Sequence, residues 1–329
     1  MKIVRVSVPG GPSALEIVEV AAPNPGVGEL RVLTKAIGVG RPDVLIRNGT
    51  YKWMPALPAT PGSELAGIVD AVGPGGDPAW IGKRVLISSR ELPHRGGCYA
   101  EQLLVPADSP FVLLDSITFE QAVSLPNFQT ADALLNQSHG SASVRNVLIT
   151  GAAGGVASAI SQLARHQDIE VIGVVSSKEK AAFAADNGVT SIVRRDLESI
   201  SSRVMELTGG RGVDLALDPL GSTIFIECLR SLAPLGTLVS YNVIAGLPAD
   251  VFKEMRALLT RSLAVRCFSM HMHDDDREAR RVPMQRLMTM MADGHIRAPA
   301  ATIIPMAEVR SAHEILDAGD TVGKIILKP

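Results

Sequence analysis

A glycine-rich turn between an apolar strand and a helix carries the clearest chemistry in this sequence. The apolar run 147–150 continues through Gly151, Gly154 and Gly155 into an amphipathic stretch. Glycines lack a Cβ and let the backbone approach a phosphate, and the free N–H groups at a helix N-terminus bind anions. Ala157 stands where a third glycine is common, and its methyl group still lets the helix pack on the strand. The spacing predicts a pyrophosphate-binding turn, with a purely structural turn as the alternative.

The next predicted strand ends in hydroxyl and basic residues, and these residues bear on the choice of cofactor. Sites for NAD place an Asp or Glu at this strand end, where it binds the ribose hydroxyls. The chain instead has Ser176, Ser177, Lys178 and Lys180 in this region, and Arg195 follows the third strand. Hydroxyl groups and cations suit the 2′-phosphate of NADP(H). Together these residues favour NADPH over NADH, although each cation alone is also compatible with a solvated surface position.

The cysteines and histidines do not form a pattern that binds a metal or builds a disulfide framework. Cys98, Cys228 and Cys267 are far apart and odd in number. His271 and His273 are the only closely spaced histidines, and alternating residues of a loop are more often exposed polar groups than ligands. We therefore expect no metal and a reducing, cytoplasmic compartment.

The bulk composition favours a two-domain protein that acts on a small molecule. A chain of 329 residues is long for one domain, and its net charge of -2 gives no reason to expect binding to nucleic acid or to an anionic membrane. The longest apolar stretch, 147–164, is interrupted by glycines and polar residues. The first residues, 1–5, alternate like a strand and lack the layout of a signal peptide. We expect neither a nucleic-acid nor a membrane partner.

Two textures of sequence indicate the elements that position these residues. Strands with period-two alternation, such as 29–36 and 66–72, predict an all-β first part. From about residue 144, apolar β runs alternate with helical stretches, which is typical of parallel strands with helices on both faces. Six such strands make a doubly wound α/β dinucleotide-binding sheet. We expect them at 146–150, 170–175, 191–194, 213–218, 237–241 and 263–268.

The tail and a set of motifs extend this organisation over nearly the whole chain. The tail predicts helices over 277–292 and 306–318, a strand near Ile303 and a last strand over 324–328 that rejoins the β part. The motifs are Leu-Ile-Arg-Asn-Gly-Thr-Tyr at 45–51, the stretch 57–73 around Pro-Gly-Ser-Glu, Gly-Cys-Tyr-Ala-Glu at 97–101, the glycine turn 151–157, Leu-Thr-Gly-Gly-Arg-Gly-Val-Asp at 207–214 and Val-Gly-Lys-Ile-Ile-Leu at 322–327.

These motifs resemble the zinc-free branch of the medium-chain dehydrogenase/reductase superfamily, and within it the NADPH:quinone oxidoreductases related to zeta-crystallin. The resemblance implies an α/β protein with a Rossmann doubly wound parallel sheet and a GroES-like β-rich catalytic domain. The catalytic domain would be formed by residues 1–122 and 269–329. The Rossmann NADP-binding domain would be formed by residues 123–268.

The resemblance also implies site residues, one position at a time. Tyr51 matches the tyrosine that approaches the nicotinamide and the substrate, and it is the candidate catalytic residue; packing on Trp53 or Pro55 is the alternative. Backbone groups after the fifth and sixth strands would hold the carboxamide of the nicotinamide. The cofactor-binding residues implied are Tyr51, Thr130, Ala153, Gly154, Gly155, Val156, Ser176, Lys180, Arg195, Tyr241, Asn242, Val243, Cys267, Phe268 and Ser269.

Two positions depart from related patterns. Ser63 stands before Glu64 where a zinc alcohol dehydrogenase has a histidine ligand of its metal, and a serine hydroxyl is a poor zinc ligand. Gly40 stands where many relatives have an asparagine. The first departure predicts zinc independence, and the second a roomier or differently polar substrate end. Arg41 could face an anionic substrate or be solvated.

The favoured reaction is hydride transfer from NADPH to a quinone or an α,β-unsaturated carbonyl compound, with Tyr51 or water supplying the proton. Hydrogen bonds alone can stabilise the enolate that develops when such an electron-poor system is reduced. An enoyl-thioester reductase is one alternative, and a low-turnover NADPH-binding structural or regulatory protein is another. The resemblance also implies a homodimer that associates through the edge of the Rossmann sheet, and the segment 263–268 is apolar enough to be covered there.

Overall fold

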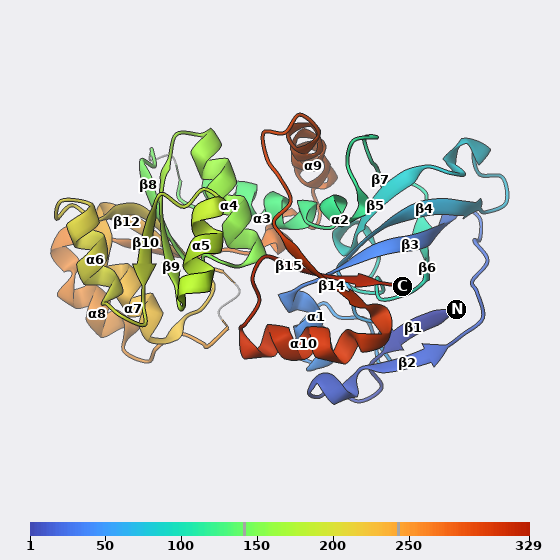
Figure 1. The fold of residues 1–329 in the computed structure, drawn as a ribbon, viewed down its shortest axis with the longest axis horizontal. Coiled ribbons are helices and arrows are strands. Elements are labelled where there is room, and N and C mark those ends of the chain that lie inside the picture. The colour runs from blue at the N-terminus through green and yellow to red at the C-terminus, as the bar shows by residue number, and fades with distance from the viewer. Residues whose placement is uncertain (141–142, 242–243) are drawn as a thin grey trace. The chain divides into compact units, whose positions relative to one another are not determined.

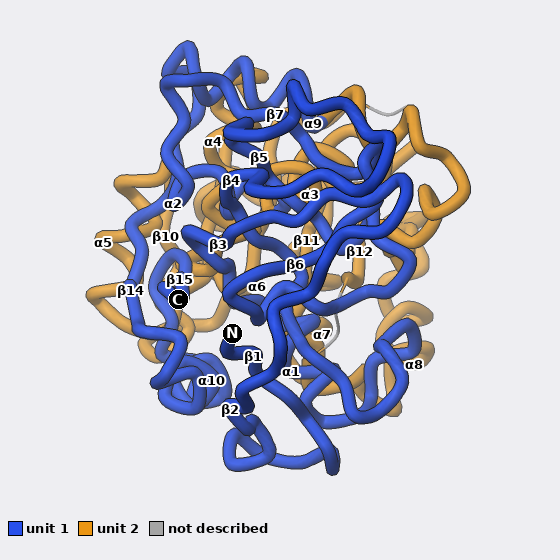
Figure 2. Tube along the Cα trace, turned by 90° about the vertical axis from the view of Figure 1, so that its right-hand side faces the viewer, with its two compact units in different colours: residues 1–126, 284–329 blue, residues 127–283 orange. Residues whose placement is uncertain are grey.

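The protein, seen here as a computed structural model that describes residues 1–140, 143–241 and 244–329, divides into two compact units. Unit 1 consists of residues 1–126 and 284–329, and unit 2 consists of residues 127–283, as coloured in Figure 2. The two boundaries fall within helices α3 (Leu125–Gln137) and α9 (Arg277–Ala292). The domain limits expected from the sequence, after residues 122 and 268, stay a prediction.

Unit 1 is built on a sheet to which both ends of the chain contribute. Its strands are β1 (Lys2–Arg5), β2 (Glu16–Glu19), β3 (Glu29–Val39), β4 (Glu64–Val72), β5 (Arg84–Ser88), β6 (Gln102–Pro106), β7 (Phe111–Val112), β14 (Ala301–Pro305) and β15 (Lys324–Lys328). Strands β1 and β2 form a separate ribbon, and the seven-stranded sheet has the order β14-β15-β3-β4-β5-β7 with β6 also paired to β3. Since β15 runs antiparallel to β3, the tail joins the β part of the chain, as predicted (Figure 1).

Three helices of unit 1 bring side chains to its core: α1 (Arg41–Arg47), α2 (Phe119–Ala122) and α10 (Val309–Ala318). Helix α1 begins directly after β3, because the Asp43 carboxylate accepts the Gly40 N–H at 2.8 Å and closes the first turn. Helix α10 buries Val309 and Ala312 against the sheet and places His313 in the interior. Both ends of the chain therefore supply polar groups to one buried region.

Unit 2 contains a parallel six-stranded sheet with the order β10-β9-β8-β11-β12-β13. The strands are β8 (Asn146–Thr150), β9 (Glu170–Val175), β10 (Ser191–Arg194), β11 (Val213–Asp218), β12 (Leu232–Ser240) and β13 (Ala264–Cys267). The first four have the predicted bounds, whereas β12 starts five residues earlier than 237 because Leu232 already pairs with Val213. Strand order reverses between β8 and β11, which is the switch point where doubly wound sheets bind ligands. The predicted fold class is confirmed.

Five helices connect the strands of this sheet. They are α4 (Gly155–His166), α5 (Lys178–Asp186), α6 (Ile200–Leu207), α7 (Ser222–Arg230) and α8 (Val251–Ala257). Helices α6 and α7 bury apolar side chains, among them Val204 and Phe225, against Leu148 and Ile172 of the sheet. Burial of these apolar surfaces stabilises the crossover connections.

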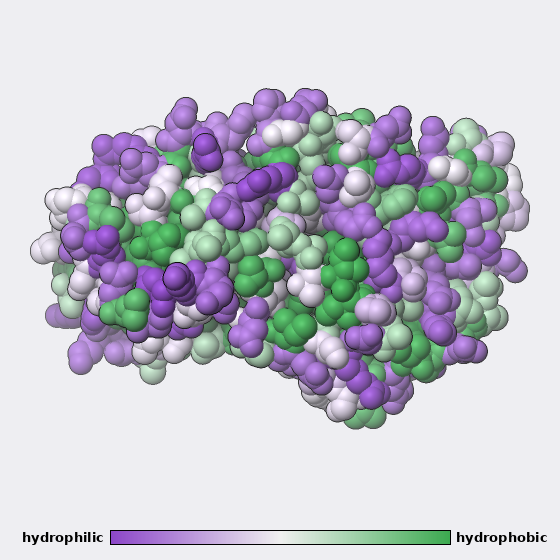
Figure 3. Space-filling model, in the orientation of Figure 1, coloured by the Kyte–Doolittle hydropathy of each residue, from purple (hydrophilic) through white to green (hydrophobic). Residues whose placement is uncertain are grey.

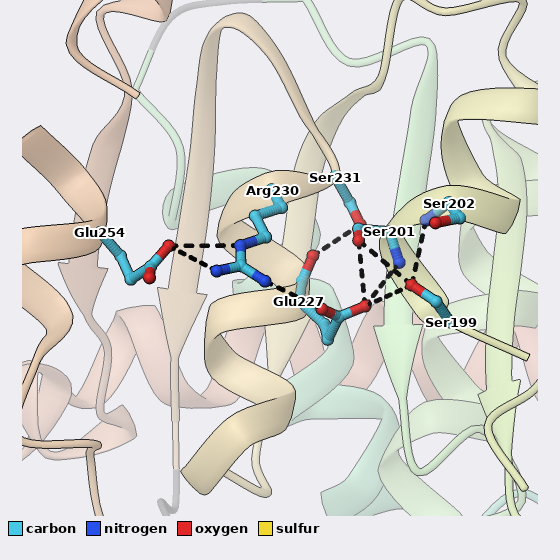
Figure 4. A network of polar contacts seen from close by, with 7 residues as sticks. All are labelled: Ser199, Ser201, Ser202, Glu227, Arg230, Ser231 and Glu254. Carbon is cyan, nitrogen blue, oxygen red and sulfur yellow. Dashed lines mark hydrogen bonds and ion pairs between the residues drawn. The ribbon is translucent and has the colours of Figure 1, made fainter. Parts of the chain in front are cut away.

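A polar network joins the ends of α6, α7 and α8 in unit 2 (Figure 4). The Glu227 carboxylate accepts hydrogen bonds from Ser199 Oγ at 2.9 Å and from the N–H and Oγ of Ser201 at 2.9 and 3.0 Å. Arg230 lies 3.6 Å from Glu227 and forms a 2.9 Å ion pair with Glu254. Because Glu227 accepts a free N–H group at the start of α6 and Arg230 pairs with Glu254 of α8, the network links three successive helices.

The length and hydropathy of the helices bear on membrane insertion. Within 1–140, 143–241 and 244–329, no helix is long and apolar enough to cross a membrane. Figure 3 shows hydrophilic residues spread over this face of both units, with apolar residues in small patches between them.

Candidate functional site

The turn after β8 has the backbone shape that a phosphate-binding loop requires. Gly151 has a φ of 63°, in the left-handed region that favours glycine. The Gly154 N–H donates to the Gly151 carbonyl at 2.9 Å, and Gly154 is the N-cap of the twelve-residue helix α4. Ala157 is buried in the first turn of that helix. The predicted loop from Ala153 to Val156 therefore lies at the positive end of a helix, where N–H groups can bind a pyrophosphate.

Asp218 at the end of β11 holds this turn from the neighbouring strand, and the sequence analysis did not single it out. Its buried carboxylate accepts Thr150 Oγ1 at 2.5 Å and the N–H groups of Leu220 and Gly221 at 3.0 and 2.9 Å. Burial raises the pKa of Asp218, against the opposing effect of these hydrogen bonds. Since Thr150 directly precedes Gly151, the carboxylate joins two strand ends at the switch point. The sequence did offer a signal for this role, because an acidic residue ends an apolar strand directly before Pro-Leu-Gly.

The structure brings together the three residues expected near the 2′-phosphate. Ser176 follows β9, and Lys180 Nζ donates to Ser176 Oγ at 3.3 Å. The Arg195 N–H donates to the Val175 carbonyl at 3.1 Å, so Arg195 lies beside the end of β9, and its side chain is exposed. Ser176 and Arg195 thus lie at the carboxyl ends of β9 and β10, and Lys180 reaches Ser176 from α5. A hydroxyl group and two cations suit a phosphate monoester.

The residues expected to hold the nicotinamide follow the last two strands. Cys267 pairs in register with Ser240, and the Phe268 N–H donates to the Ser240 carbonyl at 2.9 Å. Tyr241 follows Ser240 directly and is buried, whereas the Cys267 side chain is exposed. Ser269 caps the short helical turn that follows, since its Oγ accepts the next-but-one N–H at 3.3 Å. The two segments therefore lie side by side at the carboxyl ends of neighbouring parallel strands.

Three expected cofactor residues lack this degree of support. Asn242 and Val243 lie outside the described residues. Thr130 is half-buried on α3, and its expected role is a prediction that depends on the resemblance.

Tyr51 lies in unit 1, in the loop that follows α1. Its N–H donates to the Leu45 carbonyl at 3.2 Å, and its ring meets the Trp53 ring edge-on with centroids 5.6 Å apart. The half-buried Tyr51 thus makes the packing contact considered as the alternative to catalysis. The catalytic role of Tyr51 therefore stays a prediction.

A largely buried polar cluster in unit 1 surrounds the carboxyl group of Asp43, and we call it the Asp43 cluster: Asp43, Ser63, Glu64, Tyr99, His313, Arg47 and Lys324. The Asp43 carboxylate accepts Ser63 Oγ at 2.8 Å, the Gly40 N–H at 2.8 Å and Tyr99 Oη at 3.2 Å. Lys324 forms a buried ion pair with Glu64. Burial and the nearby Glu64 raise the pKa of Asp43 to about 7, so this carboxyl group titrates near neutrality.

The outer part of the Asp43 cluster runs from Tyr99 to the surface. His313 Nε2 is 3.1 Å from Tyr99 Oη, and His313 Nδ1 is 3.3 Å from Arg47 Nη1. Arg47 pairs with Asp317 at 2.8 Å, and Arg41 lies 3.8 Å from the same carboxylate. Arg41 is therefore engaged with α10. In the sequence, Glu64 and Lys324 stand out only as parts of motifs, so the cluster was not predicted. Charged residues inside apolar runs were a usable signal for it.

Two family models match the chain. The model described as alcohol dehydrogenase GroES-like domain matches residues 26–115, and the model described as zinc-binding dehydrogenase matches residues 155–282. Each match lies within one of the two units.

Relatives and solved structures match from end to end. The quinone oxidoreductase of Salmonella typhimurium is 32% identical, with 97% of each chain covered. The 2-haloacrylate reductase of a Burkholderia species is 30% identical, covering 97% of this chain and 96% of that protein. The structure of Escherichia coli quinone oxidoreductase complexed with NADPH has a TM-score of 0.89 and 30% identity, with 100% of both chains covered. The chain therefore belongs to the quinone oxidoreductase family of the medium-chain dehydrogenases/reductases.

Proposed function

We propose that this protein is a zinc-independent, NADPH-dependent reductase that transfers hydride to a quinone or an α,β-unsaturated carbonyl compound. The observation that carries the proposal is a glycine turn at the N-terminus of α4, hydrogen-bonded to β9, with Lys180 on the helix after β9 and Arg195 after β10. A dinucleotide pyrophosphate and a 2′-phosphate need these two features at neighbouring strand ends. The NADPH complex of the related Escherichia coli enzyme supports the same cofactor.

The residues of unit 2 fit this cofactor. The N–H groups of the loop from Ala153 to Val156 would bind the pyrophosphate, and Ser176, Lys180 and Arg195 would bind the 2′-phosphate. The segments that begin at Tyr241 and Cys267 would hold the carboxamide through backbone groups. Bound NADPH supplies the hydride for the reaction. The two cations explain why we expect NADPH rather than NADH.

The side chains around Ser63 do not fit zinc. Ser63 Oγ donates to Asp43, and the Glu64 carboxylate is paired with Lys324. In the described parts of the chain, no group of three or more His, Cys, Asp or Glu side chains is placed to hold a metal ion. Zinc sites are built from thiolate, imidazole and carboxylate ligands. This donor set is the support for zinc independence.

The substrate class is inferred from the related proteins and from the chemistry of the reduction. One relative is named for quinones and another for 2-haloacrylate, which is itself an α,β-unsaturated carboxylate. Both kinds of compound accept hydride at an electron-poor carbon and place negative charge on oxygen. Hydrogen-bond donors such as the Tyr51 hydroxyl would stabilise that charge.

We also infer a homodimer in the cytoplasm. Strand β13 is the edge of the unit 2 sheet, and an uncovered strand edge is a ready site for pairing. A second copy of the chain would cover this edge in a symmetric dimer. Light scattering that gave a monomer at micromolar concentration would contradict the dimer. The three cysteines are free, as expected for a reducing compartment.

NADPH oxidation measured with a quinone, an enone and an enoyl-CoA tests the function. We expect turnover with the quinone and the enone, weaker turnover with NADH, and unchanged rates after treatment with a metal chelator. Turnover with the enoyl-CoA alone would favour an enoyl-thioester reductase. NADPH binding without turnover of any acceptor would favour the structural or regulatory alternative.

A further inference from the structure

We propose that Ser63 and Asp43 form a two-step proton relay that delivers a proton to the oxygen of the reduced substrate. Asp43 is fully buried, whereas Ser63 is half-buried, and their side chains are joined by a 2.8 Å hydrogen bond. In this proposal the Ser63 hydroxyl is the link between the interior carboxyl group and the substrate. The inference rests on the proposed function, because that reaction creates the oxyanion to be protonated.

Hydrogen bonding directs the proton of Asp43 to one oxygen. Oδ2 accepts the Gly40 N–H at 2.8 Å and the Tyr99 hydroxyl at 3.2 Å, which occupy its two lone pairs. Oδ1 contacts Ser63 Oγ. When Asp43 is protonated, the proton must therefore lie on Oδ1 and be donated to Ser63 Oγ. The hydrogen of Ser63 is then free to point away from Asp43.

The orientation of the Tyr99 hydroxyl follows from His313 and Arg47. A guanidinium group only donates, so His313 Nδ1, 3.3 Å from Arg47 Nη1, must accept. Burial lowers the pKa of His313 to about 4, so the ring is neutral at pH 7 and its proton is on Nε2. That proton is donated to Tyr99 Oη at 3.1 Å. Tyr99 must then donate its own hydrogen to Asp43, which keeps Oδ2 occupied as an acceptor.

The groups that influence the charge of Asp43 lie on several elements: β4, β15, α1 and α10. Glu64 on β4 disfavours the ionised form of Asp43, while Lys324 on β15, Ser63 and the Gly40 N–H favour it. Burial and the nearby acids raise the pKa values of Cys98 and Tyr99 well above their usual range, so both stay neutral. Arg47 on α1 and His313 on α10 act through Tyr99. The result is a carboxyl group that can exist in both protonation states near pH 7.

The proton step balances as follows. The hydride of the proposed reaction adds to the electron-poor carbon and brings both electrons of the new C–H bond. The oxyanion of the substrate takes the hydrogen of the Ser63 hydroxyl, and Ser63 Oγ takes the proton from Oδ1 of Asp43. Asp43 is left as a carboxylate that accepts three hydrogen bonds. After product release, solvent returns a proton to Asp43 by the reverse path through Ser63.

Variants of Ser63 test the relay by kinetics. In Ser63→Ala, kcat with an enone should fall at least about tenfold, whereas kcat with a quinone, whose reduced oxygens are readily protonated by water, should fall less than about threefold. The wild-type rate with the enone should decline above about pH 7, and Ser63→Ala should lose this decline. Ser63→Thr keeps the hydroxyl and should restore both the rate and the pH profile.

Ser7→Ala is the matched control, since the Ser7 hydroxyl also donates to a carboxylate, Glu16, at 3.2 Å but at an exposed place. Its rates should equal those of the wild type. A Ser63→Ala enzyme with wild-type kcat and pH profile on the enone would overturn the relay and leave the proposed function intact.

Infrared difference spectra taken during a pH titration supply a readout that needs no turnover. The wild type should show a carboxylic-acid C=O band that titrates near pH 7 and is absent in Asp43→Asn. In Ser63→Ala its midpoint should move to higher pH, because a hydrogen bond to the carboxylate is lost. If no such band titrates near pH 7, Asp43 does not hold the proton that the relay requires, and the relay is wrong. If the band is present but the wild type reduces neither acceptor, the proposed function and the assignment of the relay to it both fail.

Discussion

The carboxyl groups of Asp43 in unit 1 and Glu227 in unit 2 each accept three hydrogen bonds, but their pKa values shift in opposite directions. Asp43 accepts three hydrogen bonds, from Gly40, Ser63 and Tyr99, and its pKa is raised to about 7. Glu227 also accepts three, all from the start of α6, and burial alone would raise its pKa. The hydrogen bonds from Ser201 and Ser199 together with the charge of Arg230 lower the pKa of Glu227 overall.

The comparison teaches that donors alone do not set the charge of a carboxyl group. Asp43 is fully buried and faces Glu64, whereas the half-buried Glu227 faces Arg230 (Figure 4). Desolvation and a like charge outweigh three hydrogen bonds in the first case, and solvent access with an opposite charge preserves the ion in the second. The Asp43 cluster can thus hold a proton in the interior of unit 1, whereas Glu227 in unit 2 is held in its ionised form by its network.

Lys324→Met should have the largest effect on stability. It leaves Glu64 buried without its cation, which costs about 3 to 5 kcal/mol of unfolding free energy. The matched change in the Glu227 network is Arg230→Met, where the side chain is 46% exposed and the cost should stay within about 1 kcal/mol. Urea unfolding of both variants measures the difference. Equal costs would mean that burial does not distinguish the two networks.

Asp43→Asn should change how stability depends on pH. The folded protein keeps the Asp43 proton up to about pH 7, while the unfolded chain releases it near 3.8, so this group makes stability fall as pH rises between these values. The slope is at most about 1.4 kcal/mol per pH unit. His313 has the opposite sign between about pH 4 and 6.5, because the unfolded chain binds a proton that the folded protein excludes. The wild-type curve minus the Asp43→Asn curve isolates the carboxyl group.

Glu227→Gln is the counterpart of that experiment. Since the pKa of Glu227 is lowered on folding, its contribution is present above its ordinary value of 4.5 and is lost as pH falls through the folded value. The variant should flatten the acid limb below about pH 4.5 and leave the region near pH 7 unchanged. A change near neutrality in this variant, or none in Asp43→Asn, would reverse the comparison.

Lys180→Ala and Arg195→Ala should give a smaller effect, confined to ligand binding. Here the surface charges of unit 2 serve the cofactor rather than the fold. Losing one charge-assisted hydrogen bond to the 2′-phosphate should weaken NADPH binding about tenfold, with little change for NADH. Lys253→Ala, at an exposed position on α8, should leave both affinities unchanged. Fluorescence titration decides, and equal losses for NADPH and NADH would exclude a 2′-phosphate contact.

Much of the fold could be predicted because its signals are local. The apolar runs of β8, β9, β10 and β11 give the bounds that the structure has, since each run is buried and ends at a polar turn. Strand β12 was predicted too short because Pro234 and Gly236 look like a turn. The structure keeps them in the strand, with a register shift opposite Val213 and Leu215.

The site was only partly predictable, because some of its residues are far apart in the sequence. Ser176 and Lys180 are one helical turn apart, so one strand end indicated both. Lys324 and Glu64 are separated by 260 residues, and a pattern read along one sequence cannot show that their side chains meet. Asp43 attracted no attention because its neighbours in sequence do not reveal burial. Its titration near neutrality is a property of the folded cluster.

Gly38 and Gly40 differ in how much space the structure leaves for a side chain at their positions. A Cβ on Gly38 would lie 2.5 Å from Glu64 Oε1 and 2.9 Å from Lys324 Cε, so the buried ion pair would have to move to admit any side chain there. A Cβ on Gly40 would meet only Pro42 Cδ at 3.5 Å and Asp43 Oδ2 at 3.9 Å, and its φ of −144° suits any residue. A mutant library across this segment should therefore retain glycine at 38 and tolerate diversity at 40. The asparagine that the family resemblance would place at position 40 is among the residues that the local backbone allows.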